Sequence, residues 1–211
     1  MDVIHPEIAK AKTLPSNYYT DESLYNSLLE KFSTTWNFVG HVAMLEQSTT
    51  IPVLIGNNPM MLTKDESGEF HCLSNVCTHR GMILSEVSTN RRTIKCPYHG
   101  RTFNLCGKLK YMPEFEQAEN FPSNSDDLPS KKVNNWHGLL FANLQNDDSF
   151  DSFISVVEDR MNFLNIEDFQ LDSKLDKTHH LDTNWMLYVD NYLEGFHIPF
   201  VHNELNSVLD Y

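Results

Sequence analysis

Two short segments of the chain each combine one cysteine with one histidine. The first holds Cys77 and His79 in the pattern C-x-H. The second follows sixteen intervening residues later and holds Cys96 and His99 in the pattern C-x-x-H. In a [2Fe-2S] cluster with mixed ligands, thiolates bind one iron, and neutral imidazoles on the other iron raise the reduction potential. Two loops that each offer one thiolate and one imidazole therefore predict a single metal centre between them.

Small and rigid residues accompany these pairs. Gly81 and Gly100 follow the first and second pair closely, and Pro97 lies inside the second segment. Glycine lets backbone N–H groups approach a cluster, and proline stiffens a loop. A zinc-stapled interaction module remains the alternative, because two cysteines and two histidines also form a tetrahedral zinc set. Zinc sites usually pair like with like, whereas each segment here mixes the two residue types.

The other two cysteines, Cys72 and Cys106, have no partner pattern. A free cysteine without such a pattern is most often a small buried side chain. We therefore predict that both are buried structural thiols.

A second group of potential ligands lies near the end of the sequence. Glu194, His197 and His202 follow the spacing E-x-x-H-x-x-x-x-H. Two imidazoles and one carboxylate with open positions are typical of non-haem Fe(II) centres. The alternative is an amphipathic surface helix that carries incidental histidines.

The local pattern predicts how these side chains are positioned. We expect a helix from Thr183 to His197 that stops where Pro199 forbids its continuation. Asp190, Glu194 and His197 would share one face of that helix at i, i+4 and i+7. The turn at Pro199 would then let His197 and His202 converge on one ion.

The elements that precede this helix predict an α+β chain. A helix capped at Thr20-Asp21 should end near Ser33, because apolar residues recur every four positions in it. A second helix should follow a polar boundary at 145–152 and carry Ile154, Val157, Met161 and Leu164 on one face. Between the two helices, short β-rich runs separated by turn residues predict a small antiparallel domain. The predicted strands are Trp36 to Val42, Ile51 to Ile55, Met60 to Leu62, Glu69 to Leu73, Thr93 to Cys96 and Leu139 to Leu144.

Composition limits the classes of partner. Sixteen Lys and Arg against twenty-nine Asp and Glu give a net charge of −13, without a basic patch. This balance disfavours nucleic acid and anionic membrane surfaces. The longest apolar runs are only a handful of residues, so no segment is expected to span a bilayer. No secretory signal is visible, and we expect a cytoplasmic protein.

Several of these motifs together resemble a known family. Residues 75–81 and 96–100 look like the two ligand loops of a Rieske [2Fe-2S] domain. The flanking residues 36–41 and 136–144 resemble that domain in the large (alpha) subunit of Rieske non-haem iron ring-hydroxylating oxygenases. The resemblance implies an antiparallel β Rieske domain of the ISP type with flanking helices, followed by the truncated start of a helix-grip catalytic domain. The implied division is a helical arm at 1–33, the Rieske domain at 34–150 and the catalytic portion at 151–211.

The same resemblance assigns the cluster ligands. Cys77 and Cys96 would hold the inner iron, and His79 and His99 the outer one. Respiratory and photosynthetic Rieske proteins have an additional cysteine in each loop, paired as a disulfide; Met82 and Tyr98 stand at those positions here. The domain therefore resembles the oxygenase and ferredoxin type, with a potential toward the low end of the Rieske range. Arg101 departs from the pattern, because the oxygenase family often has tryptophan there.

The family also has a mononuclear iron motif that resembles residues 184–202. By that resemblance His197 and His202 bind Fe(II). Glu194 is the acidic residue through which a Rieske histidine of a neighbouring subunit is coupled to the iron. A glutamate at this position looks closer to the choline and carnitine monooxygenases than to the naphthalene type.

The implied activity is that of a terminal oxygenase. A reductase or ferredoxin would supply electrons to the Rieske cluster, and the mononuclear Fe(II) would activate O₂ to hydroxylate a small organic substrate, as in aromatic ring hydroxylation. The family implies a homotrimer. Its third iron ligand is a carboxylate far downstream, whereas this sequence stops nine residues after His202. We therefore expect a truncated chain with an incompletely ligated Fe(II), and a Rieske ferredoxin-like electron carrier remains the alternative.

Overall fold

A computed structural model describes residues 4–145 and 149–209 of the chain. The backbone contacts divide it into two compact units, one formed by Leu28–Ser173 and one by Met1–Ser27 together with Lys174–Tyr211. The larger unit contains the first pair of cysteine and histidine segments, and the smaller unit contains the second group of potential ligands. The two predicted centres therefore belong to different units.

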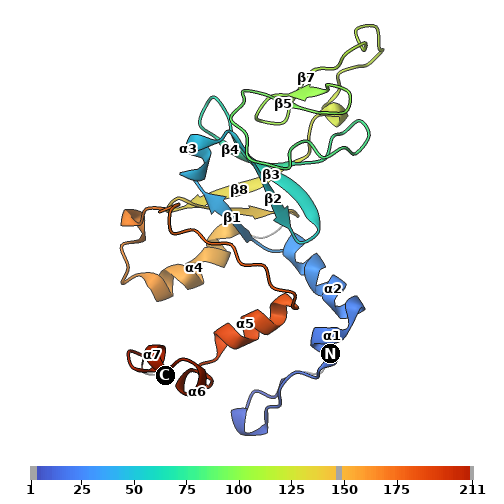
Figure 1. The fold of residues 1–211 in the computed structure, drawn as a ribbon. Helices are drawn as coiled ribbons and strands as arrows, with labels where there is room; N and C mark the ends of the chain where they lie inside the picture. The colour runs from blue at the N-terminus through green and yellow to red at the C-terminus, as the bar shows by residue number, and fades with distance from the viewer. Residues whose placement is uncertain (1–3, 146–148, 210–211) are drawn as a thin grey trace. The chain divides into compact units, whose positions relative to one another are not determined.

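The larger unit is built on an antiparallel sheet of six strands in the order β1-β9-β8-β4-β3-β2 (Figure 1). Its members are β1 (Asn37–His41), β2 (Thr50–Ile55), β3 (Asn58–Lys64), β4 (Phe70–Ser74), β8 (Ser130–Trp136) and β9 (Leu139–Asn143). Hairpins join β2 to β3, β3 to β4 and β8 to β9. The long connection between β4 and β8 leaves this sheet and forms a second one.

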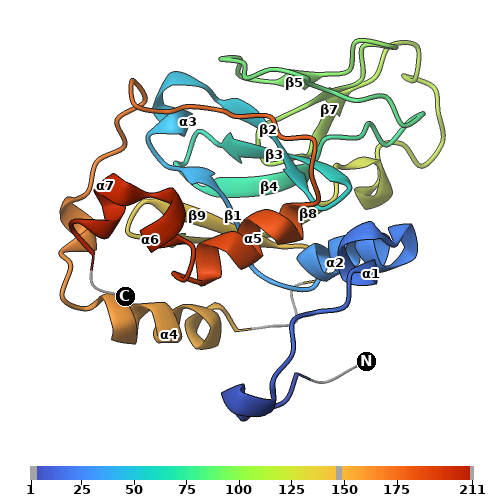
Figure 2. The ribbon, with the colours of Figure 1, turned by 60° about the horizontal axis from the view of Figure 1, so that its bottom comes forward.

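The second sheet has the order β5-β6-β7, with β5 at Ile94–Lys95, β6 at Thr102–Phe103 and β7 at Leu109–Tyr111. It forms a separate layer in both ribbon views (Figures 1 and 2). A buried apolar cluster connects the two sheets, because Met61 and Leu73 of the large sheet pack with Ile94 and Phe103 of the small one. Cys77 and Cys96 lie in the same cluster.

Two longer helices flank the sheets. Helix α2 (Glu22–Ser33) begins after Asp21, whose carboxylate accepts hydrogen bonds from the backbone N–H groups of Ser23 and Leu24 at 2.8 and 3.0 Å. Helix α4 (Phe150–Met161) packs its buried Phe150 and Ile154 against Trp36 and Trp136, beside β1, β8 and β9 (Figure 2). The remaining short helices are η1 (Ile8–Lys10), α1 (Asn17–Thr20), α3 (Met44–Gln47), η2 (Asn124–Asp126) and η3 (Ile166–Asp168).

The smaller unit contains α5 (Trp185–Leu193), α6 (Ile198–Val201) and α7 (Asn203–Asn206). The N-terminal segment belongs to it because Tyr19 contacts helix α5. The hydroxyl of Tyr19 donates to the carboxylate of Asp190, and the side-chain amide of Asn184 donates to the carbonyl of Tyr19 at 3.1 Å. Among the described residues, no helix combines the length and apolar character that a membrane span requires.

The α+β class and the antiparallel domain are confirmed, as are the six predicted strands and the helix that ends at Ser33. The sequence missed β6, β7 and β8. Helix α4 begins at Phe150, inside the stretch 145–152 that was predicted as a polar boundary, and the buried ring of Phe150 packs on Trp36. Residues 146–148 of that boundary lie outside the described residues.

Candidate metal centres

The two cysteine and histidine loops repeat one backbone geometry. The N–H of Cys77 donates to the carbonyl of Met82 at 2.8 Å, and the N–H of Cys96 donates to that of Arg101 at 2.8 Å. In each loop the glycine four residues after the cysteine donates back to the cysteine carbonyl, at 3.0 Å for Gly81 and 3.1 Å for Gly100. Both glycines have positive φ angles, 71° and 74°. The turn needs glycine for this left-handed conformation.

This geometry places sulfur inside and imidazole outside. Cys77 and Cys96 are 3% and 2% exposed, whereas His79 and His99 are half-buried. The rings of His79 and His99 meet edge to face with their centroids 4.9 Å apart. The structure therefore brings together all four residues that the sequence predicted as cluster ligands. The sulfur pair faces the apolar core, and the imidazole pair lies nearer to solvent.

A buried polar atom without a hydrogen-bond partner indicates that a metal centre fits between these loops. Nδ1 of His79 is buried and has no hydrogen-bond partner among the described residues. Buried polar atoms without a partner are uncommon in folded proteins, and a missing ion is one recognised explanation. The donor set of two thiols and two imidazoles fits a Rieske [2Fe-2S] cluster.

The electrostatic surroundings of the ligands agree with this fit. Burial lowers the pKa of His79, and the nearby His99, Arg80 and Arg101 lower it further. The imidazole is therefore held in the neutral form that binds metal. Burial raises the pKa of the Cys77 thiol. Metal binding at this position would accordingly release a proton, because the ligand is the thiolate.

The predicted helix around Glu194 is wrong at its end. Helix α5 stops at Leu193, and Glu194 is extended with φ −125° and ψ 156°. Asp190, Glu194 and His197 therefore do not share a helix face. A new helix, α6, begins at Ile198, which places Pro199 in its first turn. Proline is tolerated there because the first N–H groups of a helix have no partner within it, whereas a continuous helix would clash with the ring.

Because the helix ends before Glu194, its carboxylate can bind groups of the residues that follow it. Its carboxylate accepts from the N–H of Phe196 at 2.5 Å and lies 2.5 Å from Nδ1 of His197. The hydrogen bond with His197, opposed by burial and assisted by the N–H of Phe196, holds the pKa of Glu194 below its usual value. Because a carboxylate only accepts, Nδ1 of His197 carries the proton and Nε2 remains available for a metal.

His197 and His202 converge as predicted. His202 lies between α6 and α7, and the two rings meet edge to face with their centroids 5.2 Å apart. The reason differs from the prediction, because the short helix α6 separates the two histidines where a turn after a long helix was expected. The arrangement fits a mononuclear iron that is held by two imidazoles, with Glu194 orienting one of them.

Sequence reasoning missed a third group, formed by Asp65, Glu69 and His71 at the β3–β4 turn. In the part of the chain that the structure describes, no other set of three or more metal-binding side chains has all its ligand atoms within 4.8 Å of one another. Asp65 is already satisfied, because it accepts from the N–H and hydroxyl of Ser67 at 2.9 and 2.6 Å, from the N–H of Glu69 at 3.0 Å and from Nε2 of His71 at 2.8 Å. Burial disfavours the charge of Asp65, but these hydrogen bonds outweigh it and hold its pKa well below the usual range. The group therefore stabilises a turn.

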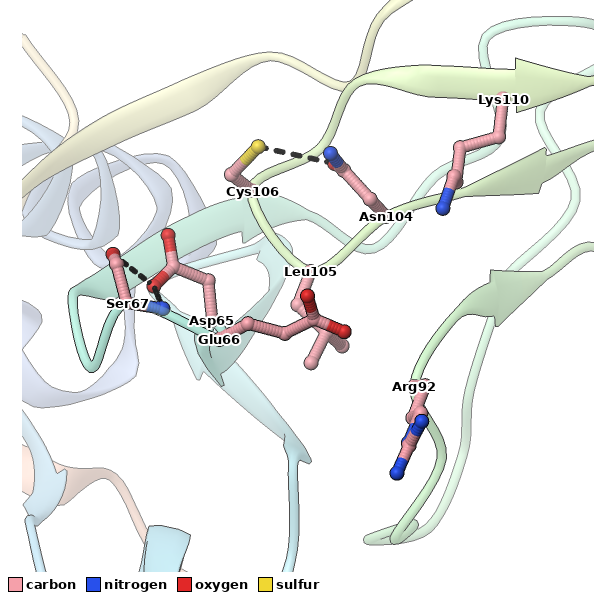
Figure 3. A pocket seen from close by; sticks show the side chains of 8 residues that line it. All are labelled: Asp65, Glu66, Ser67, Arg92, Asn104, Leu105, Cys106 and Lys110. Atoms are coloured by element: carbon pink, nitrogen blue, oxygen red, sulfur yellow. Dashed lines mark hydrogen bonds between the residues drawn. The ribbon is translucent and has the colours of Figure 1, made fainter.

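A cavity of about 200 Å³ lies beside this turn, with Asp65, Arg92 and Cys106 among its lining residues (Figure 3). Cys106 is half-buried and donates to Oδ1 of Asn104 at 3.1 Å, so the prediction that it is buried is wrong. It follows β6 in a turn of the small sheet, which brings it to the surface. Cys72 is fully buried in the centre of the large sheet, as predicted, and burial raises its pKa to about 12.

Comparison with known families matches both donor sets. Residues 35–122 match the model of the Rieske [2Fe-2S] domain, and residues 147–211 match that of the ring hydroxylating alpha subunit (catalytic domain). The first match contains Cys77, His79, Cys96 and His99. The second contains Glu194, His197 and His202. Enzymes of this family use a Rieske cluster and a mononuclear iron.

Individual relatives agree with the two domain matches. Choline monooxygenase of Beta vulgaris is 30% identical over 98% of this chain and 48% of its own length. The oxygenase subunit of glycine betaine monooxygenase from Chromohalobacter salexigens is 27% identical over 94% of this chain and 45% of its own length. The chain thus spans about half the length of the curated relatives it matches.

Solved structures give the same result. The quaternary ammonium Rieske monooxygenase CntA in complex with an inhibitor superposes with a TM-score of 0.83 at 26% identity, covering 95% of this chain and 57% of that one. Naphthalene 1,2-dioxygenase from Rhodococcus, at 23% identity and a TM-score of 0.75, shares the fold. With its two donor sets contained in consecutive domain matches, the chain belongs to the family of Rieske ring-hydroxylating oxygenase alpha subunits.

Proposed function

We propose that the chain is part of the terminal component of a Rieske non-haem iron oxygenase. When bound, the [2Fe-2S] cluster supplies electrons to a mononuclear Fe(II), which activates O₂ for hydroxylation of an organic substrate. One observation carries the proposal. The same chain holds a buried thiol pair with an adjacent imidazole pair, and a second imidazole pair whose first member is oriented by a carboxylate.

The roles of the residues follow from their positions. Cys77 and Cys96 bind the inner iron because they face the apolar core, and His79 and His99 bind the outer iron because they lie nearer to solvent. His197 and His202 bind the mononuclear iron. Glu194 holds the proton on Nδ1 of His197, so that Nε2 would be free to bind the metal. The coupling of Glu194 to a Rieske histidine of a neighbouring subunit stays part of this proposal.

The partners and location are proposed from the family. A reductase or ferredoxin is the electron donor, and the complete enzyme is a homotrimer. A structure of CntA at 27% identity and a TM-score of 0.81 is described as revealing inter-subunit electron transfer, which supports an assembly of several subunits. We retain the cytoplasm as the proposed location.

The substrate class we propose is an aliphatic amine or quaternary ammonium compound. Relatives named for choline, glycine betaine and putrescine support it, as do complexes of CntA with L-carnitine and gamma-butyrobetaine. Aromatic ring hydroxylation, expected from the sequence, has support from one relative named anthranilate 1,2-dioxygenase. Substrate-dependent O₂ consumption with choline, carnitine and anthranilate separates the two classes.

Metal analysis of the holoprotein tests the proposal against a pure electron carrier. We expect about three irons per chain, two in the cluster and one mononuclear. His197→Ala should reduce the content to about two and leave the electron paramagnetic resonance (EPR) signal of the reduced cluster unchanged. Phe196→Ala is the control for nonspecific damage, because this neighbouring side chain is exposed and no ligand. Equal iron content of about two in the wild type and His197→Ala would instead mean that this chain does not build the mononuclear site.

A further inference from the structure

A buried cation lies directly behind the second ligand loop. The Arg101 side chain is 4% exposed, and its Nη2 donates to Oδ1 of Asp126 at 2.6 Å and to the carbonyl of Asp126 at 3.1 Å. The rings of Phe103 and Phe121 lie 5.8 and 5.7 Å from the guanidinium carbon. The guanidinium of arginine is not deprotonated in proteins, so it stays positively charged in such surroundings. The position therefore holds a permanent positive charge with little access to solvent.

Asp126 connects this cation to the first ligand loop. Its backbone carbonyl also accepts from the hydroxyl of Thr78, the residue between Cys77 and His79, at 2.7 Å. One carbonyl group thus binds both loops. The carboxylate is fixed as well, because Oδ2 accepts from the N–H and the hydroxyl of Ser123 at 2.8 Å each. Its hydrogen bond with the Ser123 backbone, opposed by burial and assisted by Arg101, holds the pKa of Asp126 below its usual value.

The charges of this pair lie close to the cluster ligands. Arg101 follows the ligand His99 by two positions, and its backbone carbonyl accepts from the N–H of the ligand Cys96 at 2.8 Å. Reduction adds one electron to the cluster, so a nearby positive charge favours the reduced form and a nearby negative charge disfavours it. Water screens surface charges strongly and buried charges much less. The buried Arg101 is therefore in a position to influence the reduction potential more than a distant cation on the surface.

We propose that the Arg101–Asp126 ion pair sets the reduction potential of the Rieske cluster, with Arg101 raising the potential and Asp126 limiting that rise. The inference rests on the proposed cluster ligands. It assigns a role to the one loop position where the sequence departs from the family's usual tryptophan. Arg101 and Asp126 act through the cluster ligands and touch no substrate, so both are positioning residues.

The test is an EPR-monitored redox titration of the holoprotein with dithionite and mediators, in which each cluster takes up one electron. Arg101→Gln should shift the midpoint to a more negative value, corresponding to about a tenfold weaker reduction equilibrium, or ~59 mV for one electron. Asp126→Asn should shift it in the opposite direction, because the charge of Arg101 is then unbalanced while the carbonyl contact to Thr78 is kept. Arg101→Lys should restore the midpoint to near the wild-type value.

The opposite directions separate an electrostatic role from a merely structural one, since loosened loops would move both variants the same way. Arg160→Gln, which removes an exposed cation at the end of α4, should leave the midpoint unchanged. If Arg101→Gln does not retain its cluster, Asp126→Asn and Arg101→Lys decide. If Arg101→Gln and Asp126→Asn keep an intact Rieske signal but shift the midpoint in the same direction, this inference is overturned while the proposed function stands. A wild type without a Rieske signal would overturn the proposed function.

Discussion

Cys77 and Cys96 lie in loops anchored between two antiparallel sheets, whereas His202 is exposed between two one-turn helices. Large apolar side chains around the second site are also open to solvent, with Tyr192 82% and Phe200 85% exposed. Contiguous exposed apolar surface typically marks an interaction site or a ligand-binding groove. The comparison teaches that packing between two sheets buries the candidate cluster thiols, whereas the candidate iron ligands lie among side chains that the described residues leave open to solvent.

The largest effect should come from removing a thiolate. Cys96→Ser replaces a buried ligand by a weaker one in a loop that has no substitute, so we expect loss of the cluster and of its EPR signal after dithionite reduction. Cys106→Ser is the matched control, because that half-buried thiol lies outside the ligand loops and should leave the signal intact. A Rieske signal that survives Cys96→Ser would contradict the assignment of the first site.

A smaller effect is expected at the second site when only the orientation of a ligand changes. Glu194→Gln preserves an acceptor for the N–H of Phe196 but removes the negative charge beside Nδ1 of His197. Loss of such a supporting partner typically weakens metal binding by about 10- to 100-fold. Titration with Fe(II) of protein that keeps its cluster but lacks the mononuclear iron measures this. An unchanged affinity would mean that Glu194 does not support His197, and the cluster signal should remain constant throughout.

The repeated turn of the two cluster loops predicts a modest cost for side chains at its glycines. Gly81→Ala and Gly100→Ala should each lower the free energy of unfolding by about 1–2 kcal/mol, because both positions require a left-handed backbone. The cost should be larger for Gly100, where a new Cβ would lie 3.3 Å from Cγ of Pro113, whereas the space at Gly81 is open. Denaturant unfolding of both variants compares them, and a reversed order would show that contacts with Pro113 are readily relieved.

The smallest effect should come from the turn that holds Asp65. Asp65→Asn should destabilise the protein by about 1 kcal/mol at neutral pH, because a charged acceptor with several donors becomes neutral. The pKa of Asp65 is lowered on folding from 3.8, so its contribution is complete above that value and is lost as the pH falls through the folded-state pKa. Unfolding experiments at several pH values should show the difference from wild type constant near neutrality and shrinking below about pH 3.8. A difference that grows on acidification would contradict this account.

The cluster loops were the most predictable part of the molecule. The types and spacing of Cys77, His79, Cys96 and His99 predicted the donor set, and the positive φ angles of Gly81 and Gly100 follow from local turn geometry. The helix around Glu194 was not predicted correctly, because i, i+4 periodicity does not reveal that a glutamate side chain will satisfy the N–H of Phe196 and end the helix. The sequence also did not reveal that Cys106 is half-buried, because its exposure depends on the turn between β6 and β7.

Strand β8 is another element that its own sequence does not predict. Its sequence, Ser-Lys-Lys-Val-Asn-Asn-Trp, has no clear alternation of apolar and polar residues, yet it pairs with β4 on one side and β9 on the other. Its conformation is therefore fixed by hydrogen bonds to neighbours distant in sequence. The buried pair of Arg101 and Asp126 likewise joins residues 25 positions apart.

The sequence by itself determined which atoms are available to bind metal, because ligand chemistry depends on residue type and on spacing within a loop. Only the tertiary structure decided how those atoms are oriented, which charge lies behind the cluster loops and that Tyr19 joins helix α5. The physical reason is that orientation and burial arise from contacts between segments far apart in the chain, and such contacts leave no periodic pattern in the sequence.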